Sequence, residues 1–338
     1  MMNKWNYAPA AFEALNGVFC VYKPADVPMA RIVNMIKEKL ADGLNSMPGR
    51  PLRTMVQLNE NKTDTDGLPV VTTVPDLADH PLVVGPRYLP EDFRITYSNK
   101  LSKPSSGVVA LGIGRNGSYK ASQMKYAGYM RVYHVNGILG RCTHDFQPTG
   151  RLIERTTWRH VTSAKINRCI SAAQAGHQRN MYRYMGVEMD SQEAYEVAAR
   201  GLVRPQETVN EGPIIYGMKL VEYKPPEFTL EVHCIGEYCT YLRKFVHELS
   251  LDMKSSAVCS LVRRIRYGHF TLDHALLRKH WTVPAILGSI EHCKPLVRKD
   301  KLKPGLLMKP LEKTEKLLLP DGDFDRVEEA QEYLPTGT

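Results

Sequence analysis

The sequence predicts an α+β fold with a sizeable sheet. Val108–Gly114 is a continuous apolar run of the kind that forms a buried strand. Phe228, Leu230, Val232 and Cys234 alternate with polar residues, as in a strand with one buried face. Leu242, Phe245, Val246 and Leu249 follow the spacing of an amphipathic helix. Because strands and helices interleave without internal repeats, a mixed α+β domain is expected.

The first strand is predicted at Gly17–Tyr22, a β-rich run that ends at Lys23 and Pro24. Residues 1–16 precede it and are expected to form an N-terminal extension. The stretch 25–90 is irregular and rich in Pro, Gly, Asn and Thr, with one plausible helix at Arg31–Leu40. We therefore expect residues 25–90 to be an insertion with long loops.

The middle of the chain is regular. A half-buried strand is predicted at Tyr133–Leu139, and a helix through Ile166, Ile170 and Ala173 is expected to end at Gly176. Asp190 and Glu193 predict the start of another helix, which Gly201 would end. After Trp281 the apolar pattern fades, so residues 281–338 are expected to be a poorly ordered C-terminal extension.

Composition limits the classes of function. The formal charge of +9 and pI near 9.1 favour a polyanionic partner, nucleic acid above all. No apolar run is long enough to span a bilayer. The seven cysteines are scattered and favour reduced core thiols, with no zinc-site spacing. The N-terminus carries no clear targeting presequence.

Six segments resemble, in the same order, the TruB-type pseudouridine synthases. They are GVFCVYKP at 17–24, the stretch Lys100–Gly114, Arg131-Val132-Tyr133, Tyr195 with Ala198–Gly201, Thr240–Arg243 and Ala257–Arg264. The resemblance implies a pseudouridine synthase fold over 17–280, with a mixed, largely antiparallel sheet flanked by helices and loops.

Three short segments are similar to the second animal branch of this family, which acts on mitochondrial mRNA. They are His80–Val83, Pro226–Phe228 and Val246–Glu248. The similarity implies a mitochondrial protein without the C-terminal RNA-binding PUA domain. The implied partner is mitochondrial mRNA or tRNA, with RNA-granule proteins as further partners, and the implied reaction needs no cofactor or metal.

The resemblance assigns the catalytic positions. In the family an aspartate in the loop starts the isomerisation of uridine, and Ser102 stands at that position here. Tyr133 matches the aromatic ring that holds the flipped base, and its phenol could also transfer a proton. Arg243 matches the arginine that pairs with the aspartate. A serine needs a positioned base to become a nucleophile, so turnover is in question.

Two alternatives to the family reaction follow from Ser102. A carboxylate from Glu91, Asp92 or Asp145 could replace the aspartate. Otherwise the protein would be a catalytically dead homologue that serves as an RNA-binding or chaperone protein, or as a structural component of an RNA granule. In either case a set of basic residues is expected to contact RNA phosphates: Lys23, Lys100, Arg131, Arg263 and Arg264.

Overall fold

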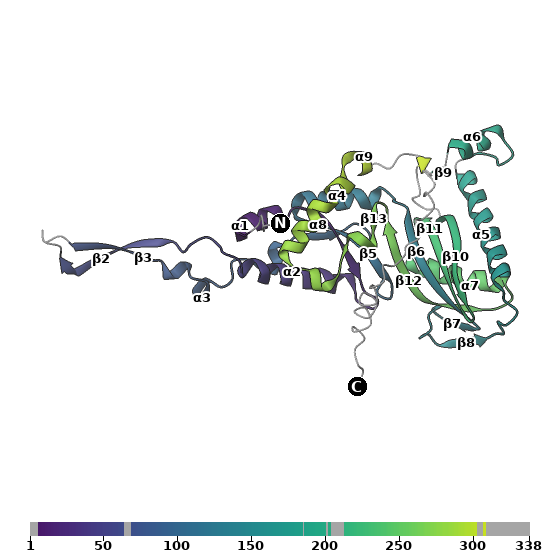
Figure 1. Ribbon diagram of the computed structural model, residues 1–338, viewed down its shortest axis with the longest axis horizontal. Coiled ribbons are helices and arrows are strands. Elements are labelled where there is room, and N and C mark those ends of the chain that lie inside the picture. The colour runs from purple at the N-terminus through teal and green to yellow at the C-terminus, as the bar shows by residue number, and fades with distance from the viewer. Residues whose placement is uncertain are drawn as a thin grey trace.

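A computed structural model describes residues 6–63, 69–184, 186–200, 202–203, 213–302 and 307–308 (Figure 1). Its centre is a nine-stranded sheet in which seven strands follow the order β10-β11-β6-β12-β5-β1-β14. These strands are β1 (Gly17–Lys23), β5 (Ser106–Ile113), β6 (Arg131–Leu139), β10 (Ile214–Lys224), β11 (Glu227–Ile235), β12 (Ala257–Tyr267) and β14 (Ala275–Leu276). Two short strands, β4 (Ile95–Tyr97) and β13 (Phe270–Thr271), pair with β5 and β12.

Two pairs in this sheet, β12 with β5 and β1 with β14, are parallel, and the other pairs are antiparallel. The sheet has two halves, β10-β11-β6-β12 and β5-β1-β14. The β12–β5 pair joins them through two residue pairs, Arg263 with Ser106 and Arg264 with Gly107. The predicted α+β class with a mixed, largely antiparallel sheet is therefore confirmed. The short parallel junction lies at the start of β5, directly after the loop that contains Ser102.

Helices cover one face of both halves. In one half this layer is formed by α1 (Ala8–Ala14), α2 (Met29–Asn45) and α8 (Val283–Cys293), and in the other by α5 (Ser163–Tyr184) and α7 (Cys239–Asp252). The opposite face of β1 and β5 packs on α4 (Gly114–Tyr126). Because both faces of β5 are covered, all its residues are buried, which explains its uninterrupted apolar sequence.

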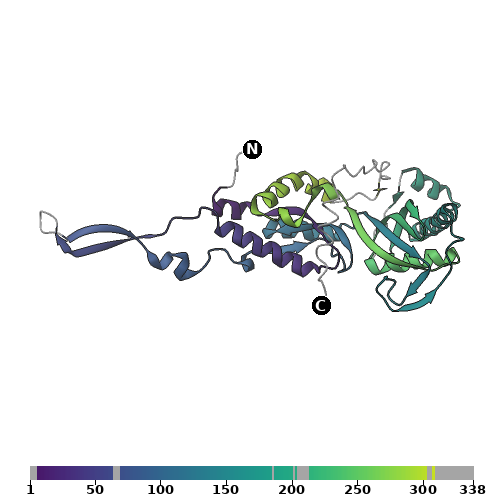
Figure 2. The ribbon, with the colours of Figure 1, turned by 60° about the horizontal axis from the view of Figure 1, so that its bottom comes forward.

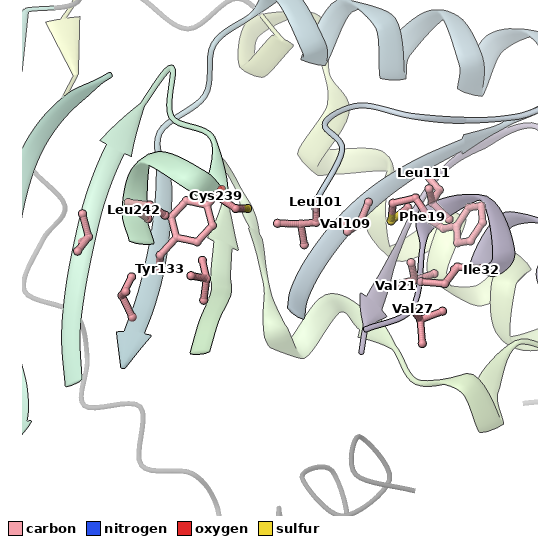
Figure 3. Packing of buried hydrophobic residues seen from close by; sticks show 14 of the residues in the cluster. Phe19, Val21, Val27, Ile32, Leu101, Val109, Leu111, Tyr133, Cys239 and Leu242 are labelled. Carbon is pink, nitrogen blue, oxygen red and sulfur yellow. The ribbon is translucent and has the colours of Figure 1, made fainter. Parts of the chain in front are cut away.

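The main core is continuous across the junction between the halves. Figure 3 shows Leu101 between two groups of buried side chains, Tyr133, Cys239 and Leu242 on one side and Phe19, Val109 and Leu111 on the other. These residues belong to one apolar cluster, so Leu101 anchors the loop before β5 in the core.

The remaining elements lie outside the main sheet. The strands β2 (Thr54–Thr63) and β3 (Pro69–Pro75) form a hairpin that projects from the body, and α3 (Pro81–Val84) follows it (Figures 1 and 2). The others are β7 (Arg141–Thr143), β8 (Leu152–Arg155), α6 (Gln192–Arg200), β9 (Leu202–Val203), α9 (Lys299–Leu302) and β15 (Leu307–Met308). No helix of the described residues is long and apolar enough to cross a membrane.

Three details differ from the sequence predictions. The helix expected to end at Gly176 runs through it to Tyr184, because that glycine has a normal helical backbone and open space around it. Within 25–90 the helix expected at Arg31–Leu40 is present as part of α2, but β2 and β3 form a hairpin where only loops were expected.

The expectation of little order after Trp281 is wrong for the described residues there. Trp281 itself is buried, and α8 contributes Val283, Ile286, Leu287 and Ile290 to the core against β1 and α2. Residues 309–338, where we expected a tail, lie outside the described residues.

Candidate active site

The loop that contains Ser102 connects β4 to β5 and is held by its own hydrogen bonds. The Ser105 amide donates to the Ser102 carbonyl at 3.2 Å, and the two serine hydroxyls lie 2.8 Å apart. Gly107 ends the loop with φ +121°, and a Cβ there would lie 2.1 Å from the Arg264 carbonyl oxygen. Only glycine fits this close approach between β5 and β12.

Two buried cations fix the same loop. The Lys23 ammonium donates to the backbone carbonyls of Pro24, Lys103 and Ser105 at 2.9, 2.9 and 2.6 Å. The Arg264 guanidinium donates to the Val108 carbonyl at 2.8 Å and to Asn99 Oδ1 at 2.6 Å. Burial lowers the pKa of Lys23 to about 8. Both cations therefore tie the loop to β1 and β12.

This burial corrects the expected phosphate contacts. Lys23, Arg131 and Arg264 are all buried and their charged groups donate to protein atoms, so they do not face solvent as phosphate ligands do. Lys100 is exposed, and Arg263 is half-buried with its guanidinium 5.5 Å from the centre of the Tyr22 ring. Of the five predicted RNA contacts, only Lys100 and Arg263 have the exposure that the role requires.

Ser102 and Arg243 come together, as the motif positions imply. The Arg243 guanidinium donates to the Ser102 hydroxyl at 3.4 Å, and Arg243 is only 8% exposed on the first turns of α7. Within the described part of the chain no carboxylate forms an ion pair with Arg243. A nearly buried cation here faces a neutral hydroxyl.

The three carboxylates considered as replacements lie elsewhere. Glu91 and Asp92 are exposed in a short 3₁₀ turn, where Asp92 accepts a hydrogen bond from the Leu89 amide at 2.8 Å. Asp145 accepts from the Gln147 amide and side chain, both at 3.1 Å, in the turn after β7. None of them contacts Ser102 or Arg243.

Tyr133 leads to a carboxylate that the sequence analysis missed. Its hydroxyl donates to Glu237 Oε1 at 2.5 Å, and Arg131 Nη1 donates to the same oxygen at 2.8 Å. Burial lowers the pKa of Arg131, but the charge and hydrogen bond of Glu237 together with Tyr133 and Tyr267 raise it, so it lies above its ordinary value. Burial and then the charge of Glu237 raise the pKa of the Tyr133 phenol well above its ordinary value.

The sequence contained only a weak sign of this carboxylate. Glu237 follows Gly236 between a predicted strand and a predicted helix, where an acidic residue is ordinarily exposed.

No group of three or more His, Cys, Asp or Glu side chains in the described residues is arranged to hold a metal ion.

Comparison with known proteins matches this site to a family. Residues 87–240 match the model of the N-terminal domain of TruB family pseudouridylate synthases. The chain is 39% identical over 292 residues to the pseudouridylate synthase TRUB2, mitochondrial, of Xenopus tropicalis, covering 85% of this chain and 88% of the relative. The chain belongs to the TruB family of pseudouridylate synthases. The matched range contains the loop with Ser102, the strand with Tyr133 and the turn with Glu237.

Further members are similar at lower identity. The human TRUB2 is 37% identical over 310 residues, covering 89% of this chain and 92% of that protein. The human TRUB1 is 27% identical over 287 residues, covering 84% and 70%. Among solved structures, the archaeal box H/ACA sRNP Nop10–Cbf5 complex matches with a TM-score of 0.43 at 12% identity, covering 87% of this chain and 60% of that chain.

Proposed function

We propose that this TruB-family protein binds mitochondrial RNA, mRNA or tRNA, and isomerises uridine to pseudouridine at the junction of the two sheet halves. The observation that carries the proposal is that Tyr133, Arg243 and the Ser102 loop, which match separate motifs of the family, surround this one junction. The mitochondrial location is supported by the names of the TRUB2 relatives.

The chemistry of the site divides between its residues. Tyr133 would supply the ring on which a flipped uracil stacks, and because it is only 1% exposed, the side chains that cover it would have to move before the base reaches it. Arg243 places a positive charge beside residue 102, and this charge could stabilise the departing uracil, which takes the electron pair as the C–N bond of the nucleotide breaks. Lys100 and Arg263 are placed to bind the RNA backbone.

One observation favours a second candidate function. Ser102 contacts the Arg243 guanidinium and the Ser105 hydroxyl, and neither group is a base that could activate a serine. The second candidate is therefore an RNA-binding homologue without turnover, which acts as a chaperone or within an RNA granule together with its proteins.

Mapping pseudouridine in mitochondrial RNA incubated with the purified protein separates the two functions. Pseudouridine formed by the wild-type protein supports the enzyme. If only Ser102→Asp forms pseudouridine, and it binds RNA as tightly as the wild-type protein does, the result supports the RNA-binding homologue. No RNA binding by either protein contradicts both.

The salt dependence of binding tests the RNA contacts. Affinity should fall by orders of magnitude between low and moderate salt. The slope of log affinity against log salt should decrease by about one for Lys100→Ala and for Arg263→Ala. Lys279→Ala, an exposed lysine outside the site, is the matched control.

A further inference from the structure

Glu237 is a buried carboxylate in the candidate active site that no family motif explained in the sequence. It lies in the turn between β11 and α7, and its side chain is 1% exposed. One oxygen, Oε1, accepts from both Tyr133 and Arg131, whereas Oε2 has no hydrogen-bond partner in the described residues. Removing a carboxylate from water in this way is costly, and a buried ion pair is weak evidence for a role in stability.

The charged and titratable groups around the Tyr133 hydroxyl come from four elements. They are Glu237 from the turn after β11, Arg131 from β6, Arg264 from β12 and Cys239 from α7. Burial and Glu237 raise the pKa of Tyr133, while Arg264 and Arg131 lower it, and the pKa remains well above its ordinary value. The phenol therefore keeps its proton at neutral pH and donates it to the Glu237 hydrogen bond.

We propose that Glu237 is a positioning residue that fixes the Tyr133 ring and keeps its hydroxyl a hydrogen-bond donor. Tyr133 then serves the site as the stacking surface for uracil and not as a proton acceptor. This inference rests on the proposed function, because it assumes that a uridine enters the site. It also assigns Arg131 a place in the site, as the cation that donates to the same Glu237 oxygen as Tyr133.

A titration without RNA tests the hydrogen bond independently of activity. In protein with ¹³C-labelled tyrosine, the Tyr133 signal is assigned by its loss in Tyr133→Phe. In the wild-type protein it should remain untitrated at the ordinary tyrosine pKa of about 10. In Glu237→Gln the pKa should fall, because Arg131 and Arg264 then act on the phenol without an opposing carboxylate.

The control is Glu248→Gln, an exposed glutamate on α7 that pairs with Lys244 and should leave the Tyr133 titration unchanged. If Glu237→Gln fails to fold because Arg131 is left buried and unpaired, the double variant with Arg131→Met removes that cation. Arg264 still lowers the Tyr133 pKa in this variant, whereas Arg131 no longer does, so a smaller fall is expected. An unchanged titration in a folded Glu237 variant overturns the proposal.

The pH dependence of turnover tests the role of Tyr133. In Ser102→Asp, the turnover rate should not depend on pH from neutral to about pH 10. In the double variant with Glu237→Gln, which lowers the Tyr133 pKa, the turnover rate should decline at alkaline pH. Tyr133→Phe should retain activity because the ring remains, whereas Tyr133→Leu should weaken RNA binding about tenfold.

A rate that rises as Tyr133 ionises overturns the proposal, since it would make the phenolate a proton acceptor. If no variant turns over, the proposed enzyme function fails, whereas the tyrosine titration still decides the role of Glu237.

Discussion

Replacing Ser102 with aspartate should create an ion pair with Arg243. The Ser102 hydroxyl lies 3.4 Å from Arg243 Nη2. Two unit charges at this distance attract by about 5 kcal/mol at an effective dielectric constant near 20. The cost of removing a carboxylate from water offsets much of this gain. Because residue 102 is half-buried, we expect Ser102→Asp to exceed Ser102→Asn in stability by about 1 to 2 kcal/mol at pH 7.

The sign of the pH dependence follows from the ion pair. Arg243 should lower the pKa of the introduced carboxyl below its value in the unfolded chain, about 3.9. The added stability is then complete above that value and is lost as the pH falls through the lowered pKa. Urea unfolding of both variants between pH 7 and the acid transition measures the difference.

Ser102→Asn is the control because it has nearly the same shape as the aspartate variant and no charge. Adding Arg243→Gln to both variants should abolish their difference, which completes a double-mutant cycle. A difference that is absent at pH 7, or that does not depend on Arg243, would refute the reasoning. The site would then not be a carboxylate site that has lost its carboxylate.

Three further substitutions test the surroundings of the site. Lys23→Met removes a donor to three carbonyls and should destabilise the protein by about 3 kcal/mol in urea unfolding. Burial lowers the Lys23 pKa from 10.5 to about 8, so the unfolded chain holds this proton more tightly than the folded protein does. The stability of the wild-type protein should therefore rise as the pH increases between these two values, whereas that of Lys23→Met should not. Gly107→Ala should cost about 3 kcal/mol or more, because its Cβ meets the Arg264 carbonyl and its φ is +121°; wild-type stability would contradict the close approach. Hydrogen bonds from His134 and His233 hold the Glu231 pKa below its ordinary value, and the stability that they provide is lost as the pH falls. Glu231→Gln should therefore make thermal unfolding less sensitive to acid. An unchanged acid transition would exclude this contribution.

Elements with a strong apolar pattern could be predicted from the sequence. The strand at Val108–Gly114 and the helix around Leu242–Leu249 lie close to their predicted positions, because burial on both faces or on one face determines their periodicity. The helix at Val283–Cys293 has the same kind of pattern, but it is short and the sequence after it is rich in Lys and Pro, which is typical of a tail. Gly176 was misread because glycine ends a helix only where the backbone turns left-handed.

The site was predictable only where a motif defined it. Ser102 and Arg243 lie together as their motif positions implied. Lys23 and Arg264 could not be recognised as buried, because lysine and arginine are rarely buried and the partners of both are mainly backbone carbonyls distant in sequence. The role of Glu237 depends on a pairing between a turn and a strand about a hundred residues apart, which no local pattern records.

If residue 102 replaces an aspartate, as the resemblance implies, the contacts of the loop account for a retained fold. The loop is held by the Lys23 ammonium, by Arg264 and by the close approach at Gly107, and none of these contacts uses the side chain of residue 102. Among the described residues, that side chain hydrogen-bonds to the Ser105 hydroxyl and to Arg243. The loop backbone is therefore held mainly by contacts that do not depend on the identity of residue 102. Since the backbone is retained, an aspartate introduced at this position should meet Arg243 in a site that is already built.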